Sequence, residues 1–288
     1  MAQASSGAEV IEKQMGFSAA PNAQRAKGCA HLCVTHHPGP QPKSKLSDLR
    51  MSGSLKLLFP RSDGPLDAVF LNSAGGVTGG DAFALSAKAE EGASLHLSSQ
   101  AAERIYKAVP GQTGRIVNKL SVGPCGELHW LPQETILFDA AALDRSLSIE
   151  MASSARVLAC EVLLFGRTAM GENVGDLRLN DKIDLRVDGK LVFADRLSIQ
   201  GDAQGQLQHM TVSSGGRAVG SVIFAAPGAA GMLDAVRSLL PISCGASALS
   251  EDLVFLRLCA PDGYELRQTL IPVLRLLSGG DLPRPWMI

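Results

Sequence analysis

Residues 116–131, IVNKLSVGPCGELHWL, place two short apolar runs on either side of a turn and decide the fold class of this 288-residue chain. Both runs are short and apolar with partial period-two alternation, which is typical of β-strands, and the glycines and proline between them mark a turn. Similar runs recur at 68–71, 93–98, 147–151, 157–164, 183–187, 191–199, 207–212, 219–225 and 253–258. The sequence therefore predicts a mainly β fold of about eleven strands.

This strand–turn–strand unit recurs as a weak internal repeat. In each copy a Leu-Ser pair opens one strand, and a second apolar strand follows after a turn. The copies begin at Leu85, Leu120, Leu147 and Leu197, and their second strands contain Leu95-His96, Leu128-His129, Val157-Leu158 and Leu207-Gln208. The offsets of 35, 27 and 50 residues are too irregular for a solenoid of fixed period. They fit hairpins or coils stacked into an elongated, β-helix-like structure.

Two helices are expected near the C-terminus. Apolar residues fall on one helical face in 232–240 and again in 264–277, where Pro272 is expected to kink or interrupt the helix. Such apolar faces serve either as core packing or as a docking surface for a partner. Both interpretations stay open on the pattern alone.

Composition excludes several classes of protein. The chain has 27 Lys and Arg against 28 Asp and Glu, a net charge of −1, and 45% hydrophobic residues, which is typical of a folded, near-neutral protein. It has no basic cluster of the kind that binds a nucleic acid or an anionic membrane surface. No apolar run reaches the roughly 18 residues that a membrane span needs. We expect neither nucleic acid nor membrane as a partner.

The N-terminal residues and the cysteines suggest a cellular location. Residues 1–24 are polar and lack the basic start and apolar core of a secretory signal, so we expect a flexible extension followed by one domain over residues 25–288. Six cysteines are too few for a disulfide framework. Free thiols and a cytoplasmic protein are the expectation.

The glycine-rich segment 72–81, NSAGGVTGGD, does not match a nucleotide-binding loop. A phosphate-binding loop of this kind needs Lys and Ser or Thr after its last glycine, whereas Asp81 follows Gly80 and its carboxylate would repel phosphate. We interpret the segment as a tight turn in which glycines supply positive φ and Asp81 accepts backbone hydrogen bonds.

Histidine and cysteine form two candidate metal groups. In residues 29–37, CAHLCVTHH, strand alternation places Cys29, His31 and Cys33 on one face, and thiolate and imidazole suit late transition metals. The second half of a zinc module is missing, so ordinary strand residues remain the alternative. His96 and His129 occupy matching positions in the repeat and are expected to stack, either around an ion or as structural histidines.

Searches for catalytic groups find no reaction centre. Glu134, Asp139, Glu161 and Glu172 have no spacing that fixes an acid–base pair. A Gly-x-Ser-x-Gly nucleophile motif is absent, and the segment 244–247, CGAS, does not complete a cysteine-protease signature. The sequence indicates a protein that is not an enzyme.

Several segments together resemble a known family. They are 71–81 (LNSAGGVTGGD), 99–106 (SQAAERIY), 130–138 (WLPQETILF), 165–167 (FGR) with 170–172 (MGE), 245–247 (GAS) and 282–286 (LPRPW). In this order they are similar to the urease accessory protein D family, called H in some bacteria. The ordered matches extend from about residue 53 to residue 286.

The resemblance implies a non-enzymatic maturation chaperone with an elongated β-structure. Its implied partners are the urease apoprotein, urease accessory protein F and the urease accessory GTPase protein G, and its implied role is to support nickel insertion into the urease active site. It implies that the two C-terminal helices dock protein F. It implies no tightly bound cofactor, only transient Ni²⁺.

The nickel route is a hypothesis that follows from the resemblance. Family members are thought to pass nickel through an internal water-filled tunnel, and we hypothesise that Asp81, Glu134, Glu161 and Glu172 include residues of its wall. The cluster of residues 29–37 is not a motif of that family. Two alternatives stay open: a β-rich interaction module unrelated to urease, and a metal-binding enzyme that uses this cluster.

Overall fold

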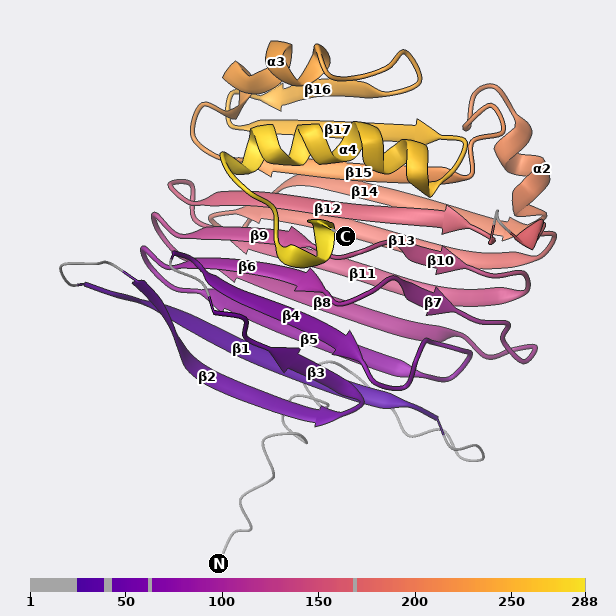
Figure 1. Cartoon of the computed structure of the whole chain (residues 1–288), viewed down its shortest axis with the longest axis horizontal. Coiled ribbons are helices and arrows are strands. Elements are labelled where there is room, and N and C mark those ends of the chain that lie inside the picture. Colours follow the sequence, from indigo (N-terminus) through magenta and orange to yellow (C-terminus); the bar gives the residue numbers. More distant parts are fainter. Residues whose placement is uncertain (1–24, 39–42, 62–63, 168–169, 288) are drawn as a thin grey trace, which may run out of the picture.

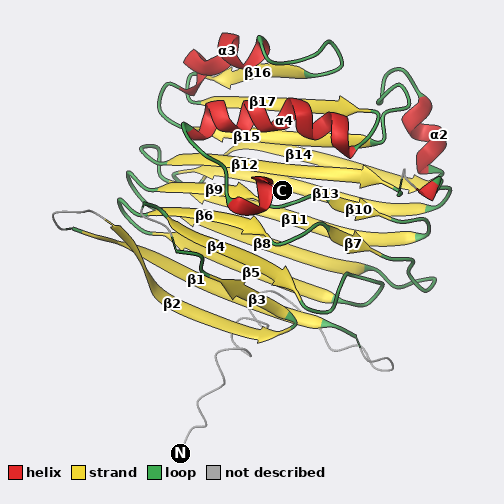
Figure 2. Cartoon of the chain, in the orientation of Figure 1, coloured by secondary structure: helices red, strands yellow, loops and turns green. Residues whose placement is uncertain are grey.

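The computed structural model describes residues 25–38, 43–61, 64–167 and 170–287, and it is built mainly from β-strands (Figure 2). The predicted N-terminal extension, residues 1–24, lies outside the described residues. The strands form two facing sheets, and successive strands climb along the molecule from the indigo end to the yellow end (Figure 1). The predicted mainly β, stacked architecture with helices near the C-terminus is confirmed.

Sheet A contains seven strands in the order β14-β13-β11-β8-β5-β1-β2. Their bounds are β1 (Lys27–His37), β2 (Lys43–Gly53), β5 (Ala82–Ala89), β8 (Gly114–Val122), β11 (Ala141–Met151), β13 (Leu177–Val187) and β14 (Lys190–Gly201). The five inner strands run parallel to one another, and β2 and β14 are antiparallel to their neighbours at the two edges.

Sheet B contains ten strands, with the order β16-β17-β15-β12-β9-β6-β4-β3, and with β10 beside β12 and β7 beside β10. Their bounds are β3 (Leu55–Leu58), β4 (Leu66–Asn72), β6 (Ser94–Ser99), β7 (Glu103–Ile105), β9 (Glu127–Leu131), β10 (Thr135–Leu137), β12 (Arg156–Phe165), β15 (Ala218–Ala225), β16 (Gly245–Ser250) and β17 (Leu253–Ala260). Its middle strands β4, β6, β9 and β12 are parallel, and antiparallel strands flank them.

The repeat in the sequence corresponds to coils of this stack. The pairs β5 with β6, β8 with β9, and β11 with β12 each place one strand in each sheet. In sheet B, Leu128 pairs with Leu95 and Val157, as the repeat predicts. In sheet A, Leu120 pairs with Ala87 and Ile149, two residues from the predicted partners. A shift of two residues keeps the same face of the strand toward the core, so the core pattern survives.

The fourth predicted copy of the repeat is wrong. Residues 207–212 are not a strand; helix α2 (Ala203–Gln208) and turns occupy this region. The Asp202 side chain caps the helix by accepting a 2.9 Å hydrogen bond from the Gly205 amide, and Ala203 and Leu207, one helical turn apart, are both buried. A cap and a buried pair at this spacing favour a helix. The alternation pattern also misses β2, β3, β7, β10 and β16. Strand β1 agrees with the alternation expected for residues 29–37, and β5 with the repeat copy that begins at Leu85.

The C-terminal helices are α3 (Leu233–Arg237), preceded by the 3₁₀ turn η2 (Ala229–Met232), and α4 (Gly263–Ser278), followed by η3 (Arg284–Met287). Helix α3 is shorter than predicted because hydrogen bonds between residues three apart, of the 3₁₀ type, follow its C-terminal end. One of them joins Leu240 N to Arg237 O at 3.1 Å. Pro272 does not end α4, since it lies on the exposed side, where water can satisfy the carbonyl that lacks its donor. None of the helices in the described ranges has the length and apolar character of a membrane span.

Two apolar layers hold the stack together. One fills the space between the sheets and includes Leu95, Leu128 and Trp130. The other lies on the outer face of sheet B, where α4 packs its apolar side. The five buried residues of α4 are Leu266, Leu270, Val273, Leu274 and Leu277. The structure thus answers the question left open for 264–277, because this apolar face is core packing.

Candidate functional site: a polar cavity between the sheets

The two sheets enclose a cavity of about 180 Å³. Its lining includes Phe83, Leu85, Ile116, Asn118 and Arg145 from sheet A and Phe70, Trp130 and Glu161 from sheet B. Exposed residues of the glycine-rich loop and of the segment after β6, Gly75 and Gln100, also line it. The cavity therefore connects a buried polar centre with the surface beside the glycine-rich loop.

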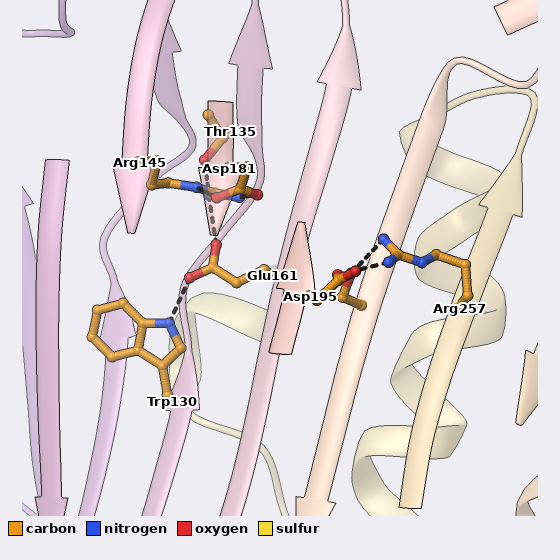
Figure 3. A network of polar contacts seen from close by, with 8 residues as sticks. Trp130, Thr135, Arg145, Glu161, Asp181, Asp195 and Arg257 are labelled. Atoms are coloured by element: carbon orange, nitrogen blue, oxygen red, sulfur yellow. Dashed lines mark hydrogen bonds and ion pairs between the residues drawn. The ribbon is translucent and has the colours of Figure 1, made fainter. Parts of the chain in front are cut away.

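Arg145 is a buried residue of the cavity lining, and Figure 3 shows its polar contacts. It lies opposite Asp181 in the β11–β13 pair and binds that carboxylate through two hydrogen bonds, Nε to Oδ1 at 2.9 Å and Nη2 to Oδ2 at 2.6 Å. Its Nη1 donates to Glu161 Oε2 at 2.6 Å, from the facing sheet, and to Thr135 Oγ1 at 3.0 Å. One cation between two carboxylates leaves a net charge of −1 when both are ionised.

Glu161 is the carboxylate that faces the cavity from sheet B. Its second oxygen, Oε1, accepts a 2.8 Å hydrogen bond from Trp130 Nε1 (Figure 3). The Trp130 ring stacks on Phe70 with centroids 5.2 Å apart, which fixes the indole. Burial raises the pKa of Glu161, and the Arg145 charge opposes that shift. The residue is therefore oriented by two donors on different oxygens.

A second carboxylate, Glu103, lines the same cavity nearer its exposed end. The pairing of β7 with β10 positions it, and Asn72 Nδ2 donates to both of its oxygens at 3.3 and 3.4 Å. Burial raises the pKa of Glu103 to about 7. Glu103 is not among the acidic residues singled out from the sequence, although it lies within the family-like segment 99–106.

Of the four predicted wall residues, the structure brings only Glu161 to the cavity. Asp81 is buried at the glycine-rich loop, where its two oxygens accept backbone hydrogen bonds from Ala26 N at 2.8 Å and Thr78 N at 2.9 Å. With positive φ at Gly75, Gly76 and Gly80, this is the tight turn that the sequence predicts.

Glu134 and Glu172 hold arginine side chains. Glu134 Oε1 accepts from Arg267 Nη1 at 2.8 Å, beneath the C-terminal segment. Glu172 Oε2 accepts from the backbone and the side chain of Arg167, at 3.0 and 2.8 Å. The contact with Arg167 lowers the pKa of Glu172. Neither carboxylate is part of the cavity lining.

The group Cys29, His31 and Cys33 lies on one face of β1, as the alternation predicts, since the residues between them belong to the core. Each member has separate surroundings. Cys29 packs with Ala84 and Val117 on the outer side of sheet A. His31 Nε2 lies 3.6 Å from Asp48 Oδ2, and Cys33 Sγ lies 3.6 Å from Glu90 Oε1.

Within the described residues, three metal-ligand atoms come within 4.8 Å of one another only at His96, Glu127 and His129. The predicted stacking of the two histidines is confirmed, with ring centroids 4.2 Å apart and planes 3° from parallel. The cluster of residues 29–37 does not form such a group among the described residues.

Fold and site together define a β-solenoid-like protein with a polar cavity between its sheets. A family model described as UreD urease accessory protein matches residues 26–287. The urease accessory protein UreD of Ruegeria sp. (strain TM1040) is 44% identical over 278 residues, covering 94% of this chain and 93% of that protein. The UreD protein of Azorhizobium caulinodans is 38% identical over 276 residues, covering 94% and 100%. The chain belongs to the UreD family of urease accessory proteins.

Proposed function

We propose that this chain is a non-enzymatic chaperone of urease maturation. In the cytoplasm it binds apo-urease together with accessory protein F and the GTPase accessory protein G, and it supports insertion of nickel into the urease active site. Family membership supports the urease part of this proposal. The observation that carries the nickel part is the polar cavity, which presents the Glu161 and Glu103 carboxylates between its buried centre and the surface.

The contacts of Glu161 suit a cation that passes through without being trapped. Carboxylate oxygens bind Ni²⁺ less strongly than imidazole or thiolate groups do. Both oxygens of Glu161 already accept hydrogen bonds, from Trp130 and Arg145, so an arriving cation competes with these donors. The ion is therefore held weakly and released readily.

Glu103 supplies the charge at the exposed end of the cavity. With a pKa raised to about 7, its carboxyl group exchanges a proton near neutral pH. A divalent cation favours the ionised form, so binding of nickel there releases the proton. The proposed route includes Glu103 and Glu161 and leaves out Asp81, Glu134 and Glu172, whose carboxylates hold backbone or arginine groups elsewhere.

We assign the docking of protein F to the end of the molecule that carries α3 and β16. The apolar face of α4 is already buried against sheet B. At the α3 and β16 end, β16 is an edge strand, and Leu239, Ile242 and Leu249 are exposed large apolar residues. An edge strand beside exposed apolar residues suits pairing with another protein chain.

The test measures nickel in urease purified from cells that carry the urease gene cluster, at equal urease yield. Removing this gene is expected to leave urease almost without nickel. Glu161→Gln and Glu103→Gln keep the side-chain shape and remove the charge, so each is expected to lower the nickel content severalfold. Glu172→Gln is the matched control, because it changes a carboxylate outside the cavity and is expected to leave loading unchanged.

Copurification of each variant with apo-urease separates a folding defect from a defect in nickel transfer. Variants that still bind apo-urease but deliver less nickel support the proposed route. Full loading by a double Glu103→Gln and Glu161→Gln variant would overturn it. Full loading without the gene would overturn the chaperone role itself.

A further inference from the structure

The stacked histidines lie on the outer face of sheet B, away from the cavity. Along β9, His129 alternates with Leu128 and Trp130, which point into the layer between the sheets. His96 lies directly opposite His129 in the β6–β9 pair. Glu127, two residues before His129 on the same face of β9, places Oε1 2.8 Å from His129 Nε2. Two imidazoles and one carboxylate therefore converge on one side of a rigid parallel sheet.

One nitrogen atom of this group lacks the partner that a buried polar atom normally has. His96 Nε2 is buried and has no hydrogen-bond partner in the described part of the chain. The His129 side chain is only 3% exposed, and its Nε2 contacts the Glu127 carboxylate. An unpaired buried nitrogen costs about 1–3 kcal/mol unless a further group binds it. His96 Nε2 beside a histidine–carboxylate pair therefore points to a ligand that binds all three side chains.

The opposite nitrogen of His96 is already oriented by a carboxylate. His96 Nδ1 lies 3.4 Å from Asp67 Oδ1 on the neighbouring strand β4. A carboxylate beside one ring nitrogen fixes the proton there and leaves the lone pair on the other, which is the arrangement found behind metal-bound histidines. His96 Nε2 is thus directed as a ligand atom toward His129 and Glu127.

We propose that His96 Nε2, His129 Nε2 and a carboxylate oxygen of Glu127 bind one divalent transition-metal ion. Imidazole and carboxylate ligands in this number suit the borderline cations Ni²⁺, Zn²⁺ and Co²⁺. Metal-to-nitrogen bonds of about 2.0–2.1 Å place ligand atoms at most about 4.2 Å apart, so binding draws the three atoms together from their present spacing within 4.8 Å and turns the two rings out of their parallel stack. Three protein ligands leave a coordination position for water or for a group from a partner.

A guanidinium group, that of Arg156, lies beside this group of three side chains. Arg156 Nε lies 3.4 Å from Glu127 Oε1, but its guanidinium also binds the Leu277 carbonyl and stacks on Phe224. These contacts anchor Arg156 to the end of α4.

The test uses the untagged full-length chain and measures binding of Ni²⁺ and Zn²⁺ by equilibrium dialysis and by the rise in Tm. Wild type is expected to bind one more metal equivalent than His96→Asn and than His129→Asn. The matched control is His31→Asn, because His31 also lies beside a carboxylate, 3.6 Å away, but has no second imidazole. This control is expected to bind as wild type does.

His96→Asn is the decisive variant, since His96 is the more exposed of the pair and its replacement disturbs packing less. Its Tm without metal reports on folding. A metal-dependent rise in Tm in wild type that is lost in His96→Asn supports the site. Equal stoichiometry and an equal rise in Tm in wild type and His96→Asn would overturn it. The test needs no urease, so its outcome is separate from that of the proposed chaperone function.

Discussion

Trp286 Nε1, near the C-terminal end of the described chain, donates a 2.8 Å hydrogen bond to the carbonyl oxygen of Leu131, 155 residues earlier. The indole is 2% exposed, and Arg267 lies over its ring at 4.9 Å. Arg267 also donates to Gln133 and Glu134. The segments WLPQE and LPRPW, two of those that carry the family resemblance, are therefore held together on the outer face of sheet B.

Trp286→Phe is expected to destabilise the fold by about 1–3 kcal/mol, because it leaves the buried Leu131 carbonyl without its donor. The free energy of unfolding in urea measures the loss. Tyr264→Phe is the control, since Tyr264 is 71% exposed and its change is expected to stay within about 0.5 kcal/mol. Equal effects of the two substitutions would show that the hydrogen bond contributes nothing.

Arg145→Met is expected to lower the free energy of unfolding by about 3–5 kcal/mol, because the buried carboxylates of Glu161 and Asp181 lose the cation with which both form ion pairs. Arg196→Met removes the other arginine paired with an aspartate of β13, Asp184, but this pair is at the surface and is expected to contribute about 0–1 kcal/mol. Urea unfolding of both variants at pH 7 gives the comparison. Similar losses would contradict the burial argument.

The raised pKa of Glu103 predicts a pH dependence of stability. The folded state holds this proton more tightly than the unfolded state, so protonated Glu103 stabilises the fold. This contribution to the free energy of unfolding is fully present below the unfolded pKa near 4.5 and is lost as pH rises through about 7. Glu103→Gln is expected to remove this decline, with a difference on the order of 2 kcal/mol between pH 5 and pH 8. Urea unfolding of wild type and variant at both pH values measures it, and parallel profiles would contradict the assigned pKa.

Asp81→Ala is expected to lower the free energy of unfolding by about 1–3 kcal/mol, because the backbone amides of Ala26 and Thr78 lose their acceptor. Asp81→Asn keeps one carbonyl oxygen and is expected to lose less. Nickel delivered per folded molecule is expected to stay unchanged in both variants, as measured from the metal content of purified urease. A loss of nickel without a loss of stability would return Asp81 to the nickel route.

Ten of the eleven strands predicted from alternation are present, because residues such as Leu128 and Trp130 face the layer between the sheets while their neighbours do not. In β5, AFALSAKA, alanines on both faces obscure the period of two, and the repeat copy that begins at Leu85 is what indicates this strand. Alternation misses short strands such as β7 and β10, which are too brief for any period to show.

The histidine pair could be predicted because the repeat aligns His96 with His129. The cavity could not, because its polar centre depends on partners from three strands. Arg145, Glu161 and Asp181 lie on β11, β12 and β13, and only the pairing of whole strands brings them together. Glu103 carries no periodic signal either, since the last strand before it ends at Ser99 and β7 has three residues.

The antiparallel strands at both ends of the stack have a consequence for how long such a protein can grow. In the parallel middle, each coil offers the next one a hydrogen-bonding edge of the same kind, and nothing in that geometry limits the number of coils. Reversal of direction at β2, β3, β14 and β15 stops this propagation. A chain cut between coils would expose the unpaired edge of a parallel strand, to which further copies could add, and would tend to form fibres. In the intact chain the antiparallel end strands cover these parallel edges.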